Sequence, residues 1–124
     1  MKASELMIGN WVIVYEKAMP VKARVEGVFG RGAMVLGHVR SADHGFMEPI
    51  PLTPEILEKN GFSKSRLMGE QRHFTYYLAP SVSLLAIYDA DFSLKIGDCA
   101  RYIKYVHELQ NAISLCGIEK EITI

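Results

Sequence analysis

The sequence predicts an α+β fold in which antiparallel strands form an N-terminal small barrel-like part and a three-stranded meander, with a short central helix and a longer C-terminal helix. Three observations support this prediction. Short runs of alternating polarity occur on both sides of a well-delimited helix at 54–60, turn residues separate these runs, and a long amphipathic segment follows at 103–116. No repeat, linker or low-complexity tract interrupts the sequence, so we expect a single domain over residues 1–124.

The first three predicted strands lie in the N-terminal third of the chain. The segment 11–15, WVIVY, is rich in β-branched and aromatic residues. Apolar and charged residues alternate over 21–29, which is typical of an antiparallel strand with one solvated face. The glycines at 30–32 predict a turn, after which 33–39 returns as a third strand. The expected buried side of the second strand contains Val21, Ala23, Val25, Gly27 and Phe29.

The central helix is predicted from its end signals. Thr53 suits the N-cap and Pro54 suits the first helical position, where its missing N–H has no intrahelical partner to lose. Gly61 suits the position after the C-cap, Asn60. We therefore expect a helix of about two turns from Pro54 to Asn60.

A polar loop at 63–71 and a three-stranded meander are predicted next. The apolar residues of the three strands are Phe74, Tyr76 and Leu78; Val82, Leu84, Ala86 and Tyr88; and Phe92, Leu94 and Ile96. Each set occupies every second position of its run, so one face of the meander is expected to be apolar and to need a covering layer.

The segment 103–116 is predicted to be that cover. At 100° per residue its apolar half contains Ile103, Tyr105, Val106, Leu109, Ala112, Ile113 and Cys116, and its polar half contains Lys104, His107, Glu108, Asn111 and Ser114. Gly117 suits the end of the helix, and the alternation at 118–124 predicts a last edge strand.

Within this helix, His107 and Glu108 begin the H-E-x-x-H zinc signature, but Asn111 stands where the second histidine is required. A catalytic zinc needs three protein ligands, and no histidine follows. We therefore predict a structural helix with a solvent-facing His107. Replacing that residue by alanine is expected to change the free energy of unfolding by no more than about 0.5 kcal/mol.

The remaining candidate metal and thiol residues give weak signals. His38 and His44, with Asp43, lie in a predicted loop, and such spacing is not diagnostic of a metal site. Cys99 and Cys116 are isolated cysteines, which we expect to be reduced and non-catalytic. The sequence thus predicts no metal, no cofactor and no enzymatic activity.

Charge and composition limit the partners. The chain is 49% hydrophobic and 23% charged, which is typical of a globular protein and too apolar for a disordered one. Lysine plus arginine and aspartate plus glutamate both number 14, so no basic excess favours a DNA-coating role. One local basic group supports an alternative hypothesis, in which the protein is a nucleic-acid-associated accessory protein of a phage or mobile element. Its residues are Lys59, Lys64, Arg66 and Arg72.

No signal peptide is recognised at the N-terminus, and the longest apolar run, LLAIY at 84–88, is far shorter than the roughly 20 residues of a membrane-spanning helix. We therefore expect a soluble, cytoplasmic protein without a membrane partner. The favoured function is a non-enzymatic binding or adaptor protein with a protein partner. The predicted terminal strand would offer it an unpaired sheet edge, and homo-oligomerisation is left open.

Four stretches of the chain also resemble a known group of proteins. LMIGNWV at 6–12, EPIPLTPEILEKNGF at 48–62, YIKYVHELQN at 102–111 and GIEKEITI at 117–124 are similar to a family of small uncharacterised proteins of Bacteroides-type gut bacteria and their phages and prophages. The resemblance implies a bacterial, prophage-associated setting and a small α+β protein. It implies no activity, ligand or partner for any residue.

Overall fold

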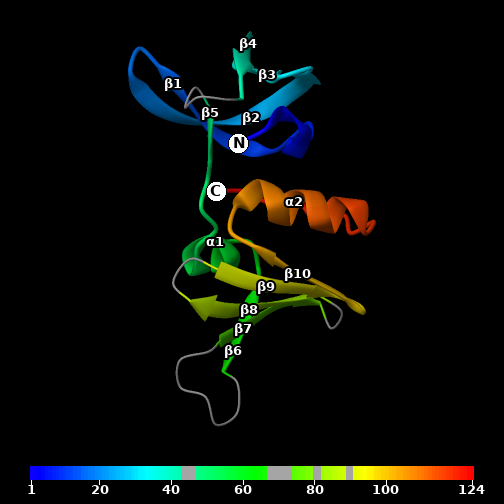
Figure 1. Ribbon diagram of the computed structural model, residues 1–124. Helices are drawn as coiled ribbons and strands as arrows, with labels where there is room; N and C mark the ends of the chain where they lie inside the picture. Colours follow the sequence, from blue (N-terminus) through cyan, green and yellow to red (C-terminus); the bar gives the residue numbers. More distant parts are fainter. Residues whose placement is uncertain (43–46, 67–73, 80–81, 89–90) are drawn as a thin grey trace.

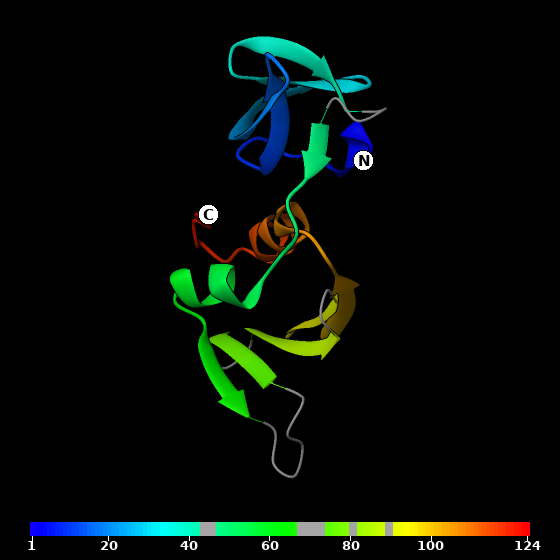
Figure 2. The same cartoon turned by 90° about the vertical axis from the view of Figure 1, so that its left-hand side faces the viewer.

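The computed structural model describes residues 1–42, 47–66, 74–79, 82–88 and 91–124, and confirms the α+β class. Two five-stranded antiparallel sheets lie on either side of the C-terminal helix, α2 (Figures 1 and 2). The first sheet has the order β4-β3-β2-β1-β5, from β1 (Trp11–Glu16), β2 (Met19–Phe29), β3 (Gly32–Val35), β4 (His38–Ser41) and β5 (Met47–Pro49). The second has the order β10-β9-β8-β7-β6, from β6 (Ser63–Arg66), β7 (Phe74–Ala79), β8 (Val82–Tyr88), β9 (Asp91–Ile96) and β10 (Cys99–Ile103). The helical elements are a 3₁₀ turn at Ala3–Glu5, α1 (Pro54–Lys59) and α2 (Val106–Leu115).

Strand β1 belongs to both hydrophobic cores. Val12 and Val14 are fully buried in the cluster of the N-terminal sheet, whereas Trp11 and Ile13 pack against the cluster of the second sheet. Because successive side chains of a strand point to opposite faces, this two-sided burial explains why WVIVY reads as a continuous apolar run. The two cores meet at β1, and the prediction of a single domain stays a prediction.

The N-terminal sheet curls into a half-barrel (Figure 1), in agreement with the predicted barrel-like part. The third predicted strand is confirmed as β3, but its continuation to residue 39 is wrong, because Leu36 and Gly37 have φ of +50° and +77° and form a two-residue turn between β3 and β4. The burial of Phe29 was also wrongly predicted, since 52% of this residue is exposed. A bulge between Val25 and Gly27 reverses the facing of the residues that follow it in β2.

Helix α1 confirms the predicted central helix. The Thr53 hydroxyl accepts a hydrogen bond from the backbone N–H of Ile56 (3.3 Å), and Pro54 is the first helical residue. Gly61 has φ of +86°, the left-handed conformation expected after the C-cap. Leu57 is completely buried, so this short helix is stabilised by packing as well as by its caps.

The three-stranded meander is confirmed as β7, β8 and β9, but the sheet has two further strands. Residues 63–66, predicted as loop, form β6 and pair with β7. Residues 67–71 of that loop, the turns at 80–81 and 89–90, and the side chains of Phe74 and Tyr88 lie outside what the structure describes. Among the predicted core residues that it does describe, Tyr76, Val82, Leu84, Phe92 and Leu94 are buried.

The start of the C-terminal helix was predicted too early. Ile103 ends β10, and α2 begins at Val106. The Glu108 carboxylate accepts hydrogen bonds from the backbone N–H groups of Lys104 (3.0 Å) and Tyr105 (3.1 Å), which stabilises the extended backbone immediately before the helix. A helical periodicity cannot detect this boundary, because Ile103 is buried in either conformation.

Helix α2 covers the second sheet, as predicted, through Leu109 and Ile113. Its polar half, however, contacts the N-terminal half of the protein. Gln110 accepts a hydrogen bond from the Trp11 backbone (2.9 Å) and donates to the carbonyl of Gly9 (3.0 Å). A helix between two sheets has two covered sides, so part of the polar half of its wheel lies inside the protein.

His107 is the main error of the helix prediction, because only 2% of its surface is exposed. The small change in the free energy of unfolding expected for His107→Ala depended on an exposed side chain, so this expectation no longer holds. Cys116, assigned to the apolar half, is exposed. The sequence pattern of α2 alone could not show that the N-terminal segment lies over the first turns of the helix.

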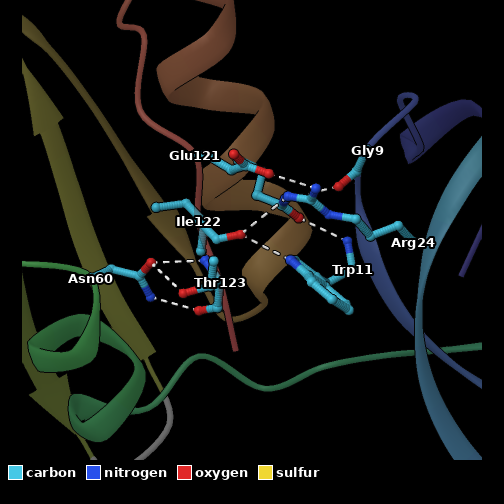
Figure 3. A network of polar contacts seen from close by, with 8 residues as sticks. Gly9, Trp11, Arg24, Asn60, Glu121, Ile122 and Thr123 are labelled. Carbon is cyan, nitrogen blue, oxygen red and sulfur yellow. Dashed lines mark hydrogen bonds and ion pairs between the residues drawn. The ribbon is translucent and has the colours of Figure 1, made fainter.

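The C-terminal segment 118–124 is not a strand, so the predicted last edge strand is wrong. Figure 3 shows that this segment joins the two halves of the protein. The carbonyl of Ile122 accepts a hydrogen bond from the Trp11 indole (2.8 Å), and Thr123 exchanges backbone hydrogen bonds with the Asn60 side chain (2.7 and 2.8 Å). Arg24 pairs with the neighbouring Glu121 (2.6 Å). These backbone groups are already bonded, so the segment does not provide the free edge that was expected.

Candidate functional site at the free edge of strand β10

Strand β10 forms one end of the second sheet. Within the residues that the structure describes, it pairs with β9 alone, and Cys99, Ala100, Arg101 and Tyr102 are exposed. Backbone pairing on its outer side starts only after Ile103, where the chain bonds to residues 50–52. The outer side of β10 thus presents backbone N–H and C=O groups that another extended chain could pair with.

An apolar groove of about 190 Å³ lies between β10, β9 and α2. Its lining residues are Leu94, Ile96, Cys99, Ala100, Arg101, Ala112, Leu115 and Cys116. In the register of β9 and β10, Cys99 is opposite Ile96 and Arg101 is opposite Leu94. These four side chains therefore share the sheet face that α2 covers. Leu115 is 77% exposed, so a large apolar side chain of the lining is accessible to a partner.

A second hollow, the His107 pocket, adjoins the apolar groove. It has a volume of about 250 Å³ and is lined by Ser4, Glu5, Met7, Arg101, His107, Glu108, Asn111 and Leu115. Arg101 and Leu115 line both hollows. On α2 the groove is lined by Ala112 and Leu115, whereas the pocket is lined by His107, Glu108, Asn111 and Leu115, so the pocket extends farther toward the N-terminus of the helix.

The imidazole of His107 is buried without a hydrogen-bond partner for either nitrogen among the described residues. Its ring stacks on Tyr105, with centroids 5.9 Å apart. Burial lowers the pKa of His107, while the carboxylates of Glu108 and Glu5 raise it by less. The ring is thus neutral near pH 7. The ionised side chains of the pocket are then two carboxylates and one guanidinium, that of Arg101.

The other candidate metal and thiol residues are not brought together. No group of three or more histidine, cysteine or acidic side chains could hold a metal ion in the described parts of the chain. His38 is exposed on β4, whereas Asp43 and His44 lie outside those parts. Cys99 and Cys116 are free, exposed and both in the lining of the apolar groove, a proximity that their separation in sequence did not indicate.

The basic residues of the nucleic-acid hypothesis are only partly described. Lys59 is exposed at the end of α1, and Lys64 is exposed on β6. Arg66 is described in its backbone alone, at the end of β6, and Arg72 lies outside the described residues. The register places Lys64 opposite Tyr76, whose ring is buried and not open to stacking by a base. The nucleic-acid role stays a prediction.

Sequence reasoning missed β10 although a local signal was present. Gly97 and Asp98 separate two segments that can pair, and Gly-Asp is a known two-residue hairpin turn. The segment CARYI was not recognised because its alternation is weak. The His107 pocket had no such signal, since it combines residues 4–7 with residues 101–115.

Comparisons with protein-family models, curated proteins and solved structures give no match to this chain. The resemblance to small proteins of gut bacteria and their phages, and the cytoplasmic location, stay predictions. No helix in the described residues is long and apolar enough to cross a membrane.

Proposed function

We propose that this protein is a non-enzymatic binding protein whose partner is an extended segment of another protein, added as a strand to the outer edge of β10. The observation on which this depends is the coincidence of a free edge with an apolar groove beside it. In strand addition, main-chain hydrogen bonds supply affinity, and pockets for alternate side chains supply specificity.

The size of the hollows supports a peptide rather than a metabolite or cofactor. Small-molecule sites usually measure about 300–1,000 Å³, whereas the apolar groove measures about 190 Å³ and the His107 pocket about 250 Å³. A groove of this size suits one apolar side chain of a bound segment. The described residues place no nucleophile or carboxylate in hydrogen-bond contact with His107, which further supports a binding role.

The other sheet edges are less suited to this role. Among the described residues the other edge strands are β5, with three residues, and β4 and β6, with four each, and short edge strands are a common protection against pairing. Within the part of the chain that the structure describes, β10 is the edge strand that lines the apolar groove beside α2. Strand β10 combines five residues with such a groove, so we place the binding site there.

The test begins with a displayed library of random nine-residue peptides selected against the purified protein. A selected peptide is then synthesised with a fluorescent label, and its binding is measured by anisotropy. We expect Leu115→Asp to weaken binding at least about tenfold, because it places a charge beside the apolar side chain of the peptide. The matched control is Ile8→Asp, since Ile8 is 74% exposed but lies outside the groove.

Strand addition also predicts a dependence on the peptide backbone. Methylation of alternate peptide nitrogens should abolish binding in one phase, where the N–H groups face β10, and should be tolerated in the other phase. Equal effects of Leu115→Asp and Ile8→Asp, or equal effects of the two methylation phases, would contradict the proposal. Failure of the library to yield any peptide that depends on Leu115 would also contradict it.

A further inference from the structure

We infer that the His107 pocket receives a cationic side chain, lysine or arginine, from the same bound segment. This basic residue is two positions from the apolar residue that fills the groove, in the direction of Ile103. This inference rests on the proposed function and adds the chemical class of the partner. It assigns to the protein a preferred partner pattern of one apolar and one basic residue, separated by one residue.

The order of the two hollows along β10 gives the spacing. The apolar groove includes Cys99 and Ala100 at the start of the strand, which the His107 pocket does not, Arg101 lines both hollows, and the pocket alone includes His107 and Glu108 in the first turn of α2. In the direction from Cys99 to Ile103, a segment paired with β10 therefore lies beside the groove first and beside the pocket next. Side chains on one face of a strand recur every two residues, about 6.6–6.8 Å apart.

The charges of the pocket favour a cation. The ionised side chains that line the pocket are two carboxylates, Glu5 and Glu108, and one guanidinium, Arg101, because His107 is neutral near pH 7; the N-terminal amino group acts on His107 more weakly than either carboxylate. The Glu5 carboxylate accepts a hydrogen bond from the backbone N–H of Lys2 (2.6 Å), and the Glu108 carboxylate accepts hydrogen bonds from the backbone N–H groups of Lys104 and Tyr105. Backbone donors satisfy some of the oxygen lone pairs without neutralising them.

The His107 imidazole is the second observation that points to a ligand. It lines the pocket, is almost completely buried, and has no partner for its nitrogens in the described residues. A neutral imidazole keeps one acceptor nitrogen, which an ammonium or guanidinium group can satisfy as a donor. An acidic side chain would offer no donor and would lie near two carboxylates, so it would gain only from Arg101.

The experiment uses the selected peptide with lysine, arginine, glutamine or glutamate at the position two residues from its apolar anchor. Binding to the full-length protein is measured at neutral pH and at two ionic strengths. We expect lysine and arginine to bind about fivefold more tightly than glutamine, which corresponds to a partly exposed ion pair. Glutamate should bind more weakly than glutamine, and these differences should shrink at high salt.

Two variants locate the effect. Glu5→Gln and Glu108→Gln keep an oxygen acceptor for the backbone hydrogen bonds but each removes one negative charge, so each should reduce the preference for lysine over glutamine from about fivefold to about twofold. Glu119→Gln is the matched control, because Glu119 is exposed beyond the end of α2 and does not line the pocket. The control should keep the full preference.

Failure of the inference is distinguishable from failure of the proposed function. Equal affinity for lysine, glutamine and glutamate peptides, with binding still weakened by Leu115→Asp, would overturn the inference and leave strand addition supported. A preference for glutamate would overturn it in favour of an acidic contact with Arg101. Peptide binding that is insensitive to Leu115→Asp would instead remove the proposed function, on which the inference rests.

Discussion

The burial of His107 makes the stability of the protein depend on pH in a definite direction. In the unfolded chain its pKa is about 6.5, whereas burial lowers the pKa in the folded protein. The unfolded state therefore binds a proton more readily as the pH falls below about 6.5. The resulting stability is fully present above that pH and is lost as the pH falls toward the lower, folded-state pKa.

The magnitude follows from the binding of one proton. Between the folded-state and unfolded-state pKa values, the free energy of unfolding should fall by up to about 1.4 kcal/mol per pH unit through His107 alone. Glu5 and Glu108 reduce this loss because their carboxylates attract the imidazolium, and the N-terminal amino group increases it. Carboxyl groups elsewhere also titrate at low pH, so the contribution must be isolated by a variant.

The assay is urea denaturation at a series of pH values between about 7.5 and 5, a range that includes the unfolded-state pKa of histidine. We compare the wild type with His107→Leu, which replaces the buried ring by an apolar side chain. The stability of the wild type relative to this variant should decrease as the pH falls below about 6.5. His38→Leu, which removes an exposed imidazole on β4, should retain the His107 slope. If the free energy of unfolding of the wild type relative to His107→Leu is constant with pH, or increases as the pH falls, the buried placement of His107 is refuted.

Three further substitutions test the packing and the contacts between the two halves, with the free energy of unfolding as the readout. Leu109→Ala should lower it by about 2–5 kcal/mol, because Leu109 is completely buried on the side of α2 that packs against the second sheet; a change below about 1 kcal/mol, as at most surface sites, would contradict this packing of the helix. Trp11→Phe should lower it by about 0.5–1.5 kcal/mol through loss of the indole hydrogen bond to Ile122, and an unchanged value would remove the C-terminal segment from the interface. Gly32→Ala should lower it by about 1–3 kcal/mol, because the added carbon would lie inside the contact distance of a β4 backbone oxygen. A neutral result there would contradict the pairing of β3 with β4.

The elements that the sequence predicted correctly have local causes. Helix α1 follows from Thr53, Pro54 and Gly61, whose effects are exerted within one or two turns of the chain. The meander follows from alternation within each strand. Both signals come from residues close together in the sequence, so neither requires knowledge of the tertiary contacts.

The errors arise where a distant segment decides the environment. His107 was assigned to solvent because its own helix is polar there, but the N-terminal segment covers it. The tail at 118–124 alternates like a strand, yet Asn60 and Trp11 bind its backbone through their side chains. Phe29 was assigned to the core because a bulge in β2 leaves no mark in the alternation of polarity.

For the candidate site, the sequence predicted the mode of binding, at a free sheet edge, but not the residues. A free sheet edge was expected, but at the C-terminal strand rather than at β10. Strand β10, CARYI, has only a weak alternation of polarity, so hydrophobic periodicity does not detect it. The His107 pocket requires residues 4–7 and 101–115 together, and this proximity is a property of the tertiary fold.

The most direct test of strand addition is amide hydrogen exchange, measured by NMR on the full-length protein with and without the selected peptide. The account predicts that alternate backbone amides between Cys99 and Ile103 exchange more slowly in the complex, because their N–H groups bond to the added strand. The amides of β4 at 38–41, an edge strand of the first sheet, should be unaffected. Slower exchange at 38–41 with no change between Cys99 and Ile103, or a uniform change over the whole protein, would contradict the claim that β10 is the binding edge.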